Sequence, residues 1–363
     1  MPLLGGERVV DRGEEPRSSY ASDVLMGVNM ARMQDSAVIC VSEGVTCSVP
    51  IQILFLSISS SRSLSPSISY PSLALALSKD SSLTLKQSYA SLSVTPEYEE
   101  KEEIQEERER EREAESLSVG NTQVSVGIGA KLKHTFTQEI SDNSMSIDVI
   151  SADVAADASY DLISLQSGAF VSKLNVHVNL TAIGANCSVT GVSIAKERQS
   201  QDIHTSIQHL DRATNSEQLQ RNVVGNKGEA IFKGRIRMPP IAQKADSSQL
   251  CRSLLLGSSA RLQAMPVLEI AADDVSCSHG AAIADLDENA MFYLASRGVD
   301  RREARKLLLG SFALELLDNA VMDKRALSRV RHSLDAMNAS ADNKEEEGET
   351  EREKGGSMGY TSM

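Results

Sequence analysis

Residues with side chains suited to chemistry lie close together between Glu269 and Ala281. If this segment is extended, Cys277 and His279 are two residues apart and point to the same face. A thiolate and an imidazole are soft and borderline metal ligands, so such a face suits a transition metal. Two ligands do not complete a tetrahedral site, so a second chain or a distant segment must supply the others. The spacing alone is more typical of a buried cysteine and a hydrogen-bonded histidine at a strand end.

For the other polar groups, a structural role is the simplest interpretation. Asp273 and Asp274 have carboxylates that suit a cation, but a turn or a cap is the favoured role for this pair. His204 and His209 are five residues apart, and we expect a structural role for both. The five cysteines are odd in number and include no CxxC pair, which is typical of free thiols in a reducing compartment.

Several classes of function lack the motifs that they require. The sequence has no GxxxxGK phosphate-binding loop, no HExxH pair and no GxSxG elbow, and Gly127-Ile128-Gly129 lacks the third glycine of a dinucleotide fingerprint. We therefore predict that this chain binds no nucleotide. No apolar run reaches the roughly 18 residues that a membrane helix needs, so we expect no membrane partner.

The net charge of −13 is concentrated in two segments. Residues 97–115 contain eleven Glu and four basic residues, a net charge of −7, and residues 342–354 have a net charge of −4. The remaining chain is nearly neutral and has no basic stripe that could hold phosphates. Aromatic residues make up only 4% and Trp is absent, which argues against stacking platforms for bases. We expect no nucleic-acid partner.

Short strands dominate the elements that must position these residues. Apolar runs such as Ala37–Val41 and Leu73–Leu77 are bounded by Gly, Pro or Ser, and residues 174–180 alternate strictly between apolar and polar. Gly-containing turns recur between the strands, and no long helix pattern occurs before residue 286. This pattern predicts an all-β array with a small aliphatic core. A stacked β-solenoid fits it, and a sandwich fits nearly as well.

The period changes to that of a helix after Leu286. Asp287 is placed to cap a helix that Gly298 stops, and Asp300 with Glu303 forms a capping-box pattern for a second helix. A third helix is predicted over 324–337. Three helices alone bury little apolar surface, so their apolar stripe must pack against the β-array, a partner, or both.

These patterns divide the chain into four parts. The predicted parts are a disordered or truncated N-terminal segment (1–30), a β core (31–285) with low-complexity insertions at 57–72 and 97–115, a helical subdomain (286–337) and a disordered tail (338–363).

The chemical cluster also resembles a known family. Residues 268–281 resemble the LEI-ADDV-CSHGA signature of SufD proteins, and residues 291–298 are similar to the FYL-SRG segment of the family. The sequence also resembles the family at the FxGxI strand (231–236) and at the D-x-H-T motif (202–205). The resemblance covers roughly residues 30–335. The CSHGA sequence resembles SufD rather than its paralogue SufB.

The resemblance implies a fold and a role. The implied fold is mainly β, a right-handed parallel β-helix followed by a C-terminal α-helical subdomain. The implied role is that of a non-catalytic scaffold that pairs with SufB, docks the SufC ATPase and builds iron–sulfur clusters for apoproteins. In the family, the histidine of CSHGA lies at the SufB interface and holds the nascent cluster with a SufB cysteine. The corresponding residue is His279, and Cys277 is its neighbouring family cysteine.

The resemblance also implies that the ATPase docks on the helical subdomain. The residues implied in that docking are Phe292, Tyr293, Arg297, Gly298, Leu307, Leu308 and Leu314.

The sequence departs from the family in two respects. Ala282 and Ala284 stand where the family usually has Thr and Gly. The N-terminal helical region of the family is missing or altered, and the segments 57–72 and 97–115 resemble insertions or a faulty gene prediction.

Two other functions fit an all-β array. A carbohydrate-active β-solenoid, such as a lyase, requires clustered carboxylates and basic residues, for which Asp273 and Asp274 are the one candidate pair. A purely structural solenoid would give no purpose to the CSHGA cluster or to the capped helices. Co-purification with an ATPase partner discriminates among the three. The low-complexity segments favour a eukaryotic gene and a plastid stroma location, with bacterial cytoplasm as the alternative.

Overall fold

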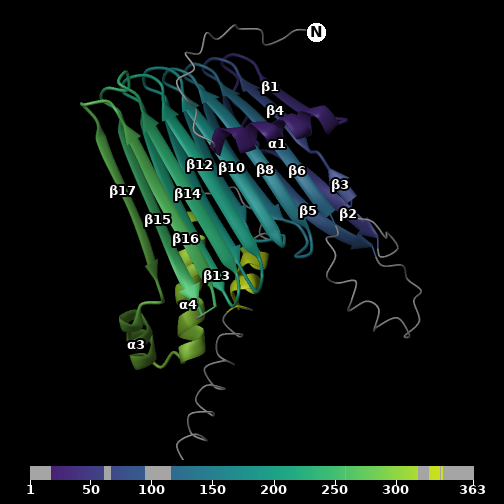
Figure 1. Ribbon diagram of the computed structural model, residues 1–363, viewed down its shortest axis with the longest axis vertical. Helices are drawn as coiled ribbons and strands as arrows, with labels where there is room; N and C mark the ends of the chain where they lie inside the picture. The colour runs from purple at the N-terminus through teal and green to yellow at the C-terminus, as the bar shows by residue number, and fades with distance from the viewer. Residues whose placement is uncertain are drawn as a thin grey trace, which may run out of the picture.

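The computed structural model describes residues 18–60, 67–94, 116–257, 259–317, 327–335 and 337. Most of them form two long sheets of nine and eight strands. From β4 onward, successive strands alternate between the two sheets, and each pairs in parallel with the strand two places away (Figure 1). The chain therefore winds as a parallel β-solenoid. This confirms the β-helix and rules out the sandwich that fitted the sequence nearly as well.

The strands have the following bounds. The first sheet contains β1 (Ala37–Val41), β3 (Ser67–Ser69), β4 (Ser72–Leu77), β6 (Ser116–Val126), β8 (Met145–Val154), β10 (Val171–Leu180), β12 (Ser200–His209), β14 (Glu229–Met238) and β16 (Arg261–Ile270). The second contains β2 (Ile51–Ser60), β5 (Ser82–Val94), β7 (Lys131–Glu139), β9 (Ser159–Gln166), β11 (Asn186–Ala195), β13 (Asn215–Gly225), β15 (Asp246–Leu256) and β17 (Ser276–Ala284).

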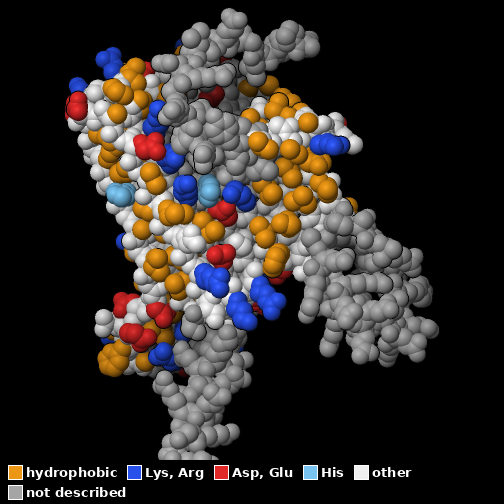
Figure 2. Space-filling view, viewed as in Figure 1, with side chains coloured by type: hydrophobic (Ala, Val, Ile, Leu, Met, Phe, Trp, Pro, Cys, Tyr) orange, Lys and Arg blue, Asp and Glu red, His pale blue; other side chains and the backbone are white. Residues whose placement is uncertain are grey.

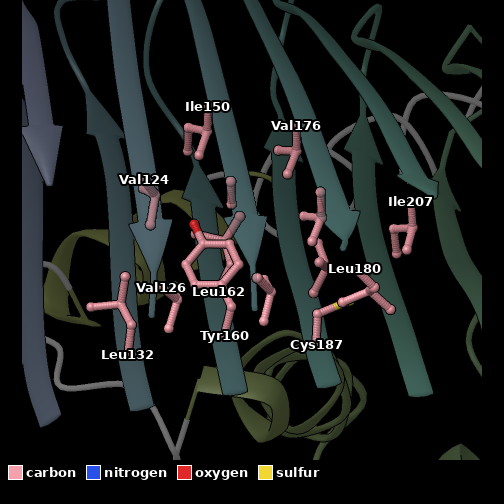
Figure 3. Close-up of a cluster of buried hydrophobic side chains, with 14 of the residues drawn as sticks. Val124, Val126, Leu132, Ile150, Tyr160, Leu162, Val176, Leu180, Cys187 and Ile207 are labelled. Carbon is pink, nitrogen blue, oxygen red and sulfur yellow. The ribbon is translucent and has the colours of Figure 1, made fainter. Parts of the chain in front are cut away.

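The core lies between the two sheets and consists mainly of aliphatic side chains. Leu174, Val176 and Leu180 of β10 point inward and are buried. The in-register pairing of β10 with β12 places Val178 directly beside Ile207. Figure 3 shows Val176, Leu180 and Ile207 in this core with side chains from neighbouring strands. Because like positions stack from strand to strand, alternation within one strand is enough to build a continuous core.

The turns that lead from the first sheet to the second use a repeated left-handed conformation. Asp80 and Asp157 have φ of 54° and 53°, and aspartate tolerates this region better than most residues other than glycine. In the next turn after Asp157, Gly184 has φ of 71°, and a Cβ there would lie 2.2 Å from Oδ1 of Asp157. Glycine at Gly184 thus avoids both the strain of a left-handed backbone and a close approach to the Asp157 carboxylate.

The N-terminal region differs from its prediction. Residues Ser18–Arg32 form helix α1, which differs from the disorder or truncation predicted for this part of 1–30, while residues 1–17 lie outside the described residues. Figure 1 shows α1 lying across the face of the first sheet. The buried Asn29 amide donates hydrogen bonds to the carbonyl oxygens of Pro71 and Val119, 3.0 and 2.6 Å away. The residues that anchor α1 are distant from it in the sequence. The N-terminal segment alone therefore does not predict this anchoring.

The Ser-rich segment is also more regular than expected. The predicted low-complexity insertion at 57–72 contains strand structure, because β2 continues to Ser60, Ser67–Ser69 form β3, and β4 begins at Ser72. Pairing of β2 with β5 extends through Ser60, so backbone hydrogen bonding overrides the weak strand propensity of serine. Residues 61–66, the predicted acidic insertion at 97–115 and the predicted tail at 338–363 lie outside the described residues.

The C-terminal helices are α3 (Glu288–Ser296), α4 (Arg301–Leu314), the 3-10 turn η1 (Glu315–Leu317) and a helix over residues 327–335. Among them, α4 and the helix over residues 327–335 pack against the second sheet, so the sequence-based expectation of packing on the β-array is confirmed for them. Leu309 and Ala313 of α4 are buried in one cluster with Val192 of β11, Val223 of β13 and Leu254 of β15. Figure 1 shows α3 and α4 at the end of the solenoid where β17 finishes.

Candidate functional site at the open end of the solenoid

The solenoid ends at β16 and β17. Among the described residues, β16 pairs only with β14, and β17 pairs only with β15. Each therefore has one backbone edge without a strand partner. Such edges are templates for pairing with another chain.

Cys277 and His279 lie on the inward face of β17. In the register of β15 with β17, Ser247 is beside Cys277 and Gln249 is beside His279. A Cβ on Gly280 would lie 3.4 Å from Leu250 Cδ1, which places Gly280 on the outer face and its neighbour His279 on the opposite one. The structure thus puts both residues on one face, as their spacing predicts.

Among the residues that the structure describes, no further strand covers β17, and this determines how exposed these side chains are. Ser247 and Gln249 are buried, because β17 covers them. His279, at the equivalent position one strand further, is exposed, and Cys277 is partly buried. The His279 side chain on β17 is therefore accessible to a partner that covers the open end.

The Cys277 thiol is held against the core. Its Sγ lies 3.3 Å from Sδ of the buried Met238. Burial raises the pKa of the Cys277 thiol, and the negative charge of Asp246 raises it further. The thiol form is thus favoured, which is the weaker metal ligand. Within the described part of the chain, no group of three or more His, Cys, Asp or Glu side chains is arranged to hold a metal.

The other polar candidates from the sequence have structural surroundings. Asp273 and Asp274 lie in the loop between β16 and β17, where the Asp274 N–H donates to Gln243 Oε1 at 3.0 Å and its carbonyl accepts from Lys244. This confirms a turn role for Asp274. His209 is buried, and its ring nitrogens lie 2.8 and 2.9 Å from the hydroxyls of Thr214 and Ser216, which confirms its structural role.

His204 lies on the opposite side of β12 from His209, because five residues separate them. Its Nε2 lies 2.9 Å from Asp202 Oδ1 on the outer face of the first sheet. The structure therefore does not bring His204 and His209 together.

The helix boundaries follow the capping pattern of the sequence. Asp287 Oδ1 accepts a hydrogen bond from the Asn289 N–H, and Asp300 Oδ1 accepts one from the Glu303 N–H, both at 2.9 Å. Gly298 has φ of 83° directly after α3, where glycine costs least. Among the described residues, no helix is both long enough and apolar enough to cross a membrane.

The residues expected to dock an ATPase divide into two groups. Phe292 and Tyr293 of α3 and Leu307 of α4 are exposed, with 77%, 58% and 54% of their surface accessible. The Arg297 guanidinium lies over the Tyr293 ring, 5.3 Å from its centroid. Leu308 is half-buried, and Leu314 packs against the buried cluster between the helices and the second sheet. Three of the expected docking side chains are thus exposed apolar groups, two on α3 and one on α4.

Sequence reasoning missed a row of buried amides that leads to the open end. Gln249 Nε2 donates to Gln218 Oε1 at 2.7 Å, and Gln218 Nε2 donates to Thr205 Oγ1 at 2.5 Å. A Cβ at Gly234 would lie 2.1 Å from Gln249 Nε2, so the facing strand leaves room for this amide. The sequence does show glutamines at inward positions of successive strands. However, only the register between the strands shows that these side chains meet.

Residues 80–312 match the family described as SUF system FeS cluster assembly, SufBD core domain. The chain belongs to the SufBD family. The matched span contains the open end with Cys277 and His279, all of α3 and most of α4. The matched family is one of iron–sulfur cluster assembly, and not one of carbohydrate-active or purely structural solenoids.

Similar proteins come from plastids and bacteria. The chloroplastic protein ABCI7 of Arabidopsis thaliana is 37% identical over 191 residues, or 52% of this chain and 40% of that protein. The SufBD family protein slr0076 of Synechocystis is 36% identical over 191 residues, again 52% of this chain, and 42% of that protein. The Escherichia coli assembly protein SufD is 30% identical over 206 residues, 56% of this chain and 48% of that protein. Each alignment spans less than half of the relative.

Proposed function

We propose that this protein is a SufD-type scaffold subunit that pairs with a SufB-like paralogue through the open end of its solenoid. The observation that carries the proposal is the position of His279, exposed on the inward face of a strand whose outer edge has no partner among the described residues. A second solenoid that continues the sheets would satisfy both free edges. It would also enclose His279 between the two subunits.

In this arrangement His279 contributes one ligand to a nascent iron–sulfur cluster, which is the cargo of the complex. A neutral imidazole nitrogen is a suitable ligand for iron, and a cysteine of the SufB-like partner supplies thiolate. Cys277 shapes the floor of the site, because its thiol is held against Met238 and its raised pKa disfavours the thiolate. The assembled cluster then passes to recipient apoproteins.

The exposed side chains of α3 and α4 form the docking surface for a SufC-like ATPase. Phe292, Tyr293 and Leu307 provide an apolar centre, and Arg297 fixes the Tyr293 ring by a cation–π contact. The ATPase activity resides in that partner, and this chain binds no nucleotide and catalyses no reaction. The complex operates in the plastid stroma of a eukaryote or in bacterial cytoplasm.

Movement of the docked ATPase reaches the solenoid through Arg221 of β13. Its guanidinium donates to the Phe312 carbonyl oxygen and forms an ion pair with Glu315 at 2.8 Å. It also lies over the Phe312 ring, 5.0 Å from the centroid. The end of α4 is thereby fixed to the second sheet.

The test is co-expression with matched SufB and SufC, comparing wild type, His279→Ala and Ser278→Ala. Ser278 lies on the other face of the same strand and serves as the matched control. We expect all three chains to form the complex, with anaerobic cluster absorbance reduced only in His279→Ala. Failure of the wild-type chain to associate with either partner would refute the scaffold function. Equal absorbance in all three complexes would refute the ligand role of His279.

A further inference from the structure

A second polar cluster lies on the outer face of the first sheet, where the scaffold function assigns no role. It includes Asp202 and His204 of the D-x-H-T motif. The registers of β10, β12 and β14 place Asn175, His204 and Lys233 side by side. Figure 2 shows Lys or Arg side chains on both sides of a histidine near the middle of this face, with an acidic group beside them.

These side chains surround a small recess of about 20 Å³. A volume of this size holds one water-sized group, such as a single oxygen of a larger ligand. The recess is lined by Asn175, His177, His204, Thr205, Ser206, Lys233 and Arg235.

Asn175, which lines the recess, has a hydrogen-bond donor that is not used. Asn175 is only 3% exposed, and its Nδ2 has no hydrogen-bond partner among the described residues. Buried donors are nearly always paired, because an unpaired one loses its hydration without compensation. Other buried polar atoms lack partners too, such as Oε1 of Gln201. Gln201 points into the solenoid, however, whereas Asn175 borders a recess with two cationic side chains.

The charges around the recess favour an anion. Asp202 is already engaged by Lys173 Nζ and His204 Nε2, at 2.8 and 2.9 Å. Burial opposes ionisation of Asp202, but its hydrogen bonds to His204 and Lys173 outweigh this effect, and its pKa lies below the usual value. The negative charge of Asp202 is therefore already paired with Lys173 and His204.

The two cations differ in their pairing. Arg235 Nε lies 3.3 Å from Glu269 Oε1. Lys233 forms no ion pair with any residue that the structure describes. The recess thus combines an unused amide donor, an uncompensated ammonium group and a guanidinium whose other N–H groups remain available as donors.

We propose that this recess binds a small oxyanion, either a phosphate or a carboxylate group. One oxygen enters the recess and accepts a hydrogen bond from Asn175 Nδ2. Lys233 and Arg235 balance the charge of the oxygens that remain outside. The site is independent of the open end, so the full chain binds the anion without SufB or SufC.

The test is calorimetric titration of the full-length chain at constant ionic strength, with inorganic phosphate and, separately, with formate. We expect a dissociation constant of about 1 mM for the preferred anion. Asn175→Leu removes the donor at similar volume, and Lys233→Gln removes the charge. Each should weaken binding by about tenfold or more, which corresponds to the loss of one charge-assisted contact.

Lys133→Gln provides the matched control, because Lys133 is an exposed lysine on β7 of the other sheet. It should bind as the wild type does. Lys233→Gln keeps the proposal testable if Asn175→Leu fails to fold. Tighter binding of phosphate assigns a phosphate group as the ligand class, and tighter binding of formate assigns a carboxylate. No binding of either anion at about 10 mM, or wild-type affinity in both variants, would overturn the proposal.

Discussion

Asp148 is a fully buried carboxyl group on the inward side of β8. Ser146 Oγ donates to its Oδ2 at 2.5 Å, and a Cβ at Gly120 would lie 2.0 Å from its Oδ1. Burial raises the pKa of Asp148 from 3.8 to about 6, although hydrogen bonds from Ser146 and Tyr89 partly oppose this. The unfolded chain therefore releases this proton at lower pH than the folded one. Stability falls as pH rises from 4 to 6.

This pH dependence predicts the effect of Asp148→Asn, which cannot ionise. A pKa shift from 3.8 to about 6 corresponds to about 3 kcal/mol that the wild type loses across this window. The free energy of unfolding of the variant relative to wild type should rise by that order between pH 4 and 7, measured in urea. Glu217→Gln, at an exposed carboxyl group on β13, is the control. A difference that does not vary with pH would contradict the prediction.

At the scale of elements, α4 has one buried side and one exposed side. Leu309 is buried against the second sheet, and Leu307, two residues earlier, is exposed. Residues two positions apart in a helix point about 200° away from each other. One side of α4 therefore holds the helix to the solenoid, and the other side is free to dock a partner. The helix over residues 327–335 is also attached to the second sheet, because Arg329 forms an ion pair with Glu139 of β7 at 2.6 Å.

The two leucines form a matched pair of test sites. Leu309→Ala should destabilise the attachment of the helices by about 2–5 kcal/mol, because it leaves a cavity, and limited proteolysis should then cut near residue 300. Leu307→Ala should change stability by less than about 0.5 kcal/mol but reduce co-purification of a SufC-like ATPase. If both variants lose the ATPase equally while resisting protease, the docking surface has been assigned to the wrong side.

At the scale of the whole molecule, a solenoid has two ends that its own strands do not cover. Among the described residues, β1 and β2 at the first end each pair on one edge, as do β16 and β17 at the last. Ile283 of β17 is 52% exposed on the inward face. An apolar, unpaired edge of this kind favours association.

We therefore expect the isolated chain to self-associate in a concentration-dependent way through its last strands. Ile283→Lys should reduce this association and also weaken pairing with a SufB-like partner, because a buried lysine would lose its hydration. Sedimentation measures the first effect and co-purification the second. Ile183→Lys, at an exposed turn position, is the control. Self-association of Ile283→Lys at the wild-type level would show that the open end is not the contact.

Local patterns in the sequence determined much of this protein. The caps at Asp287 and Asp300, the stop at Gly298 and the change from strands to helices after residue 286 depend on neighbours within a few residues, and the structure confirms them. The common face of Cys277 and His279 follows from strand geometry alone. The resemblance to SufD proteins predicted the parallel solenoid, which periodicity could not separate from a sandwich.

Only the tertiary structure decided which distant residues lie together. The anchoring of α1 by Asn29, the amide row from Thr205 to Gln249 and the recess beside Asn175 join residues about 13 to 90 positions apart. The exposure of His279 likewise depends on β17 being the last strand in the described part of the chain, because the same position one turn earlier is buried. A sequence records the period of each strand, but the register and stacking order arise from pairing between strands, and they determine which side chains meet.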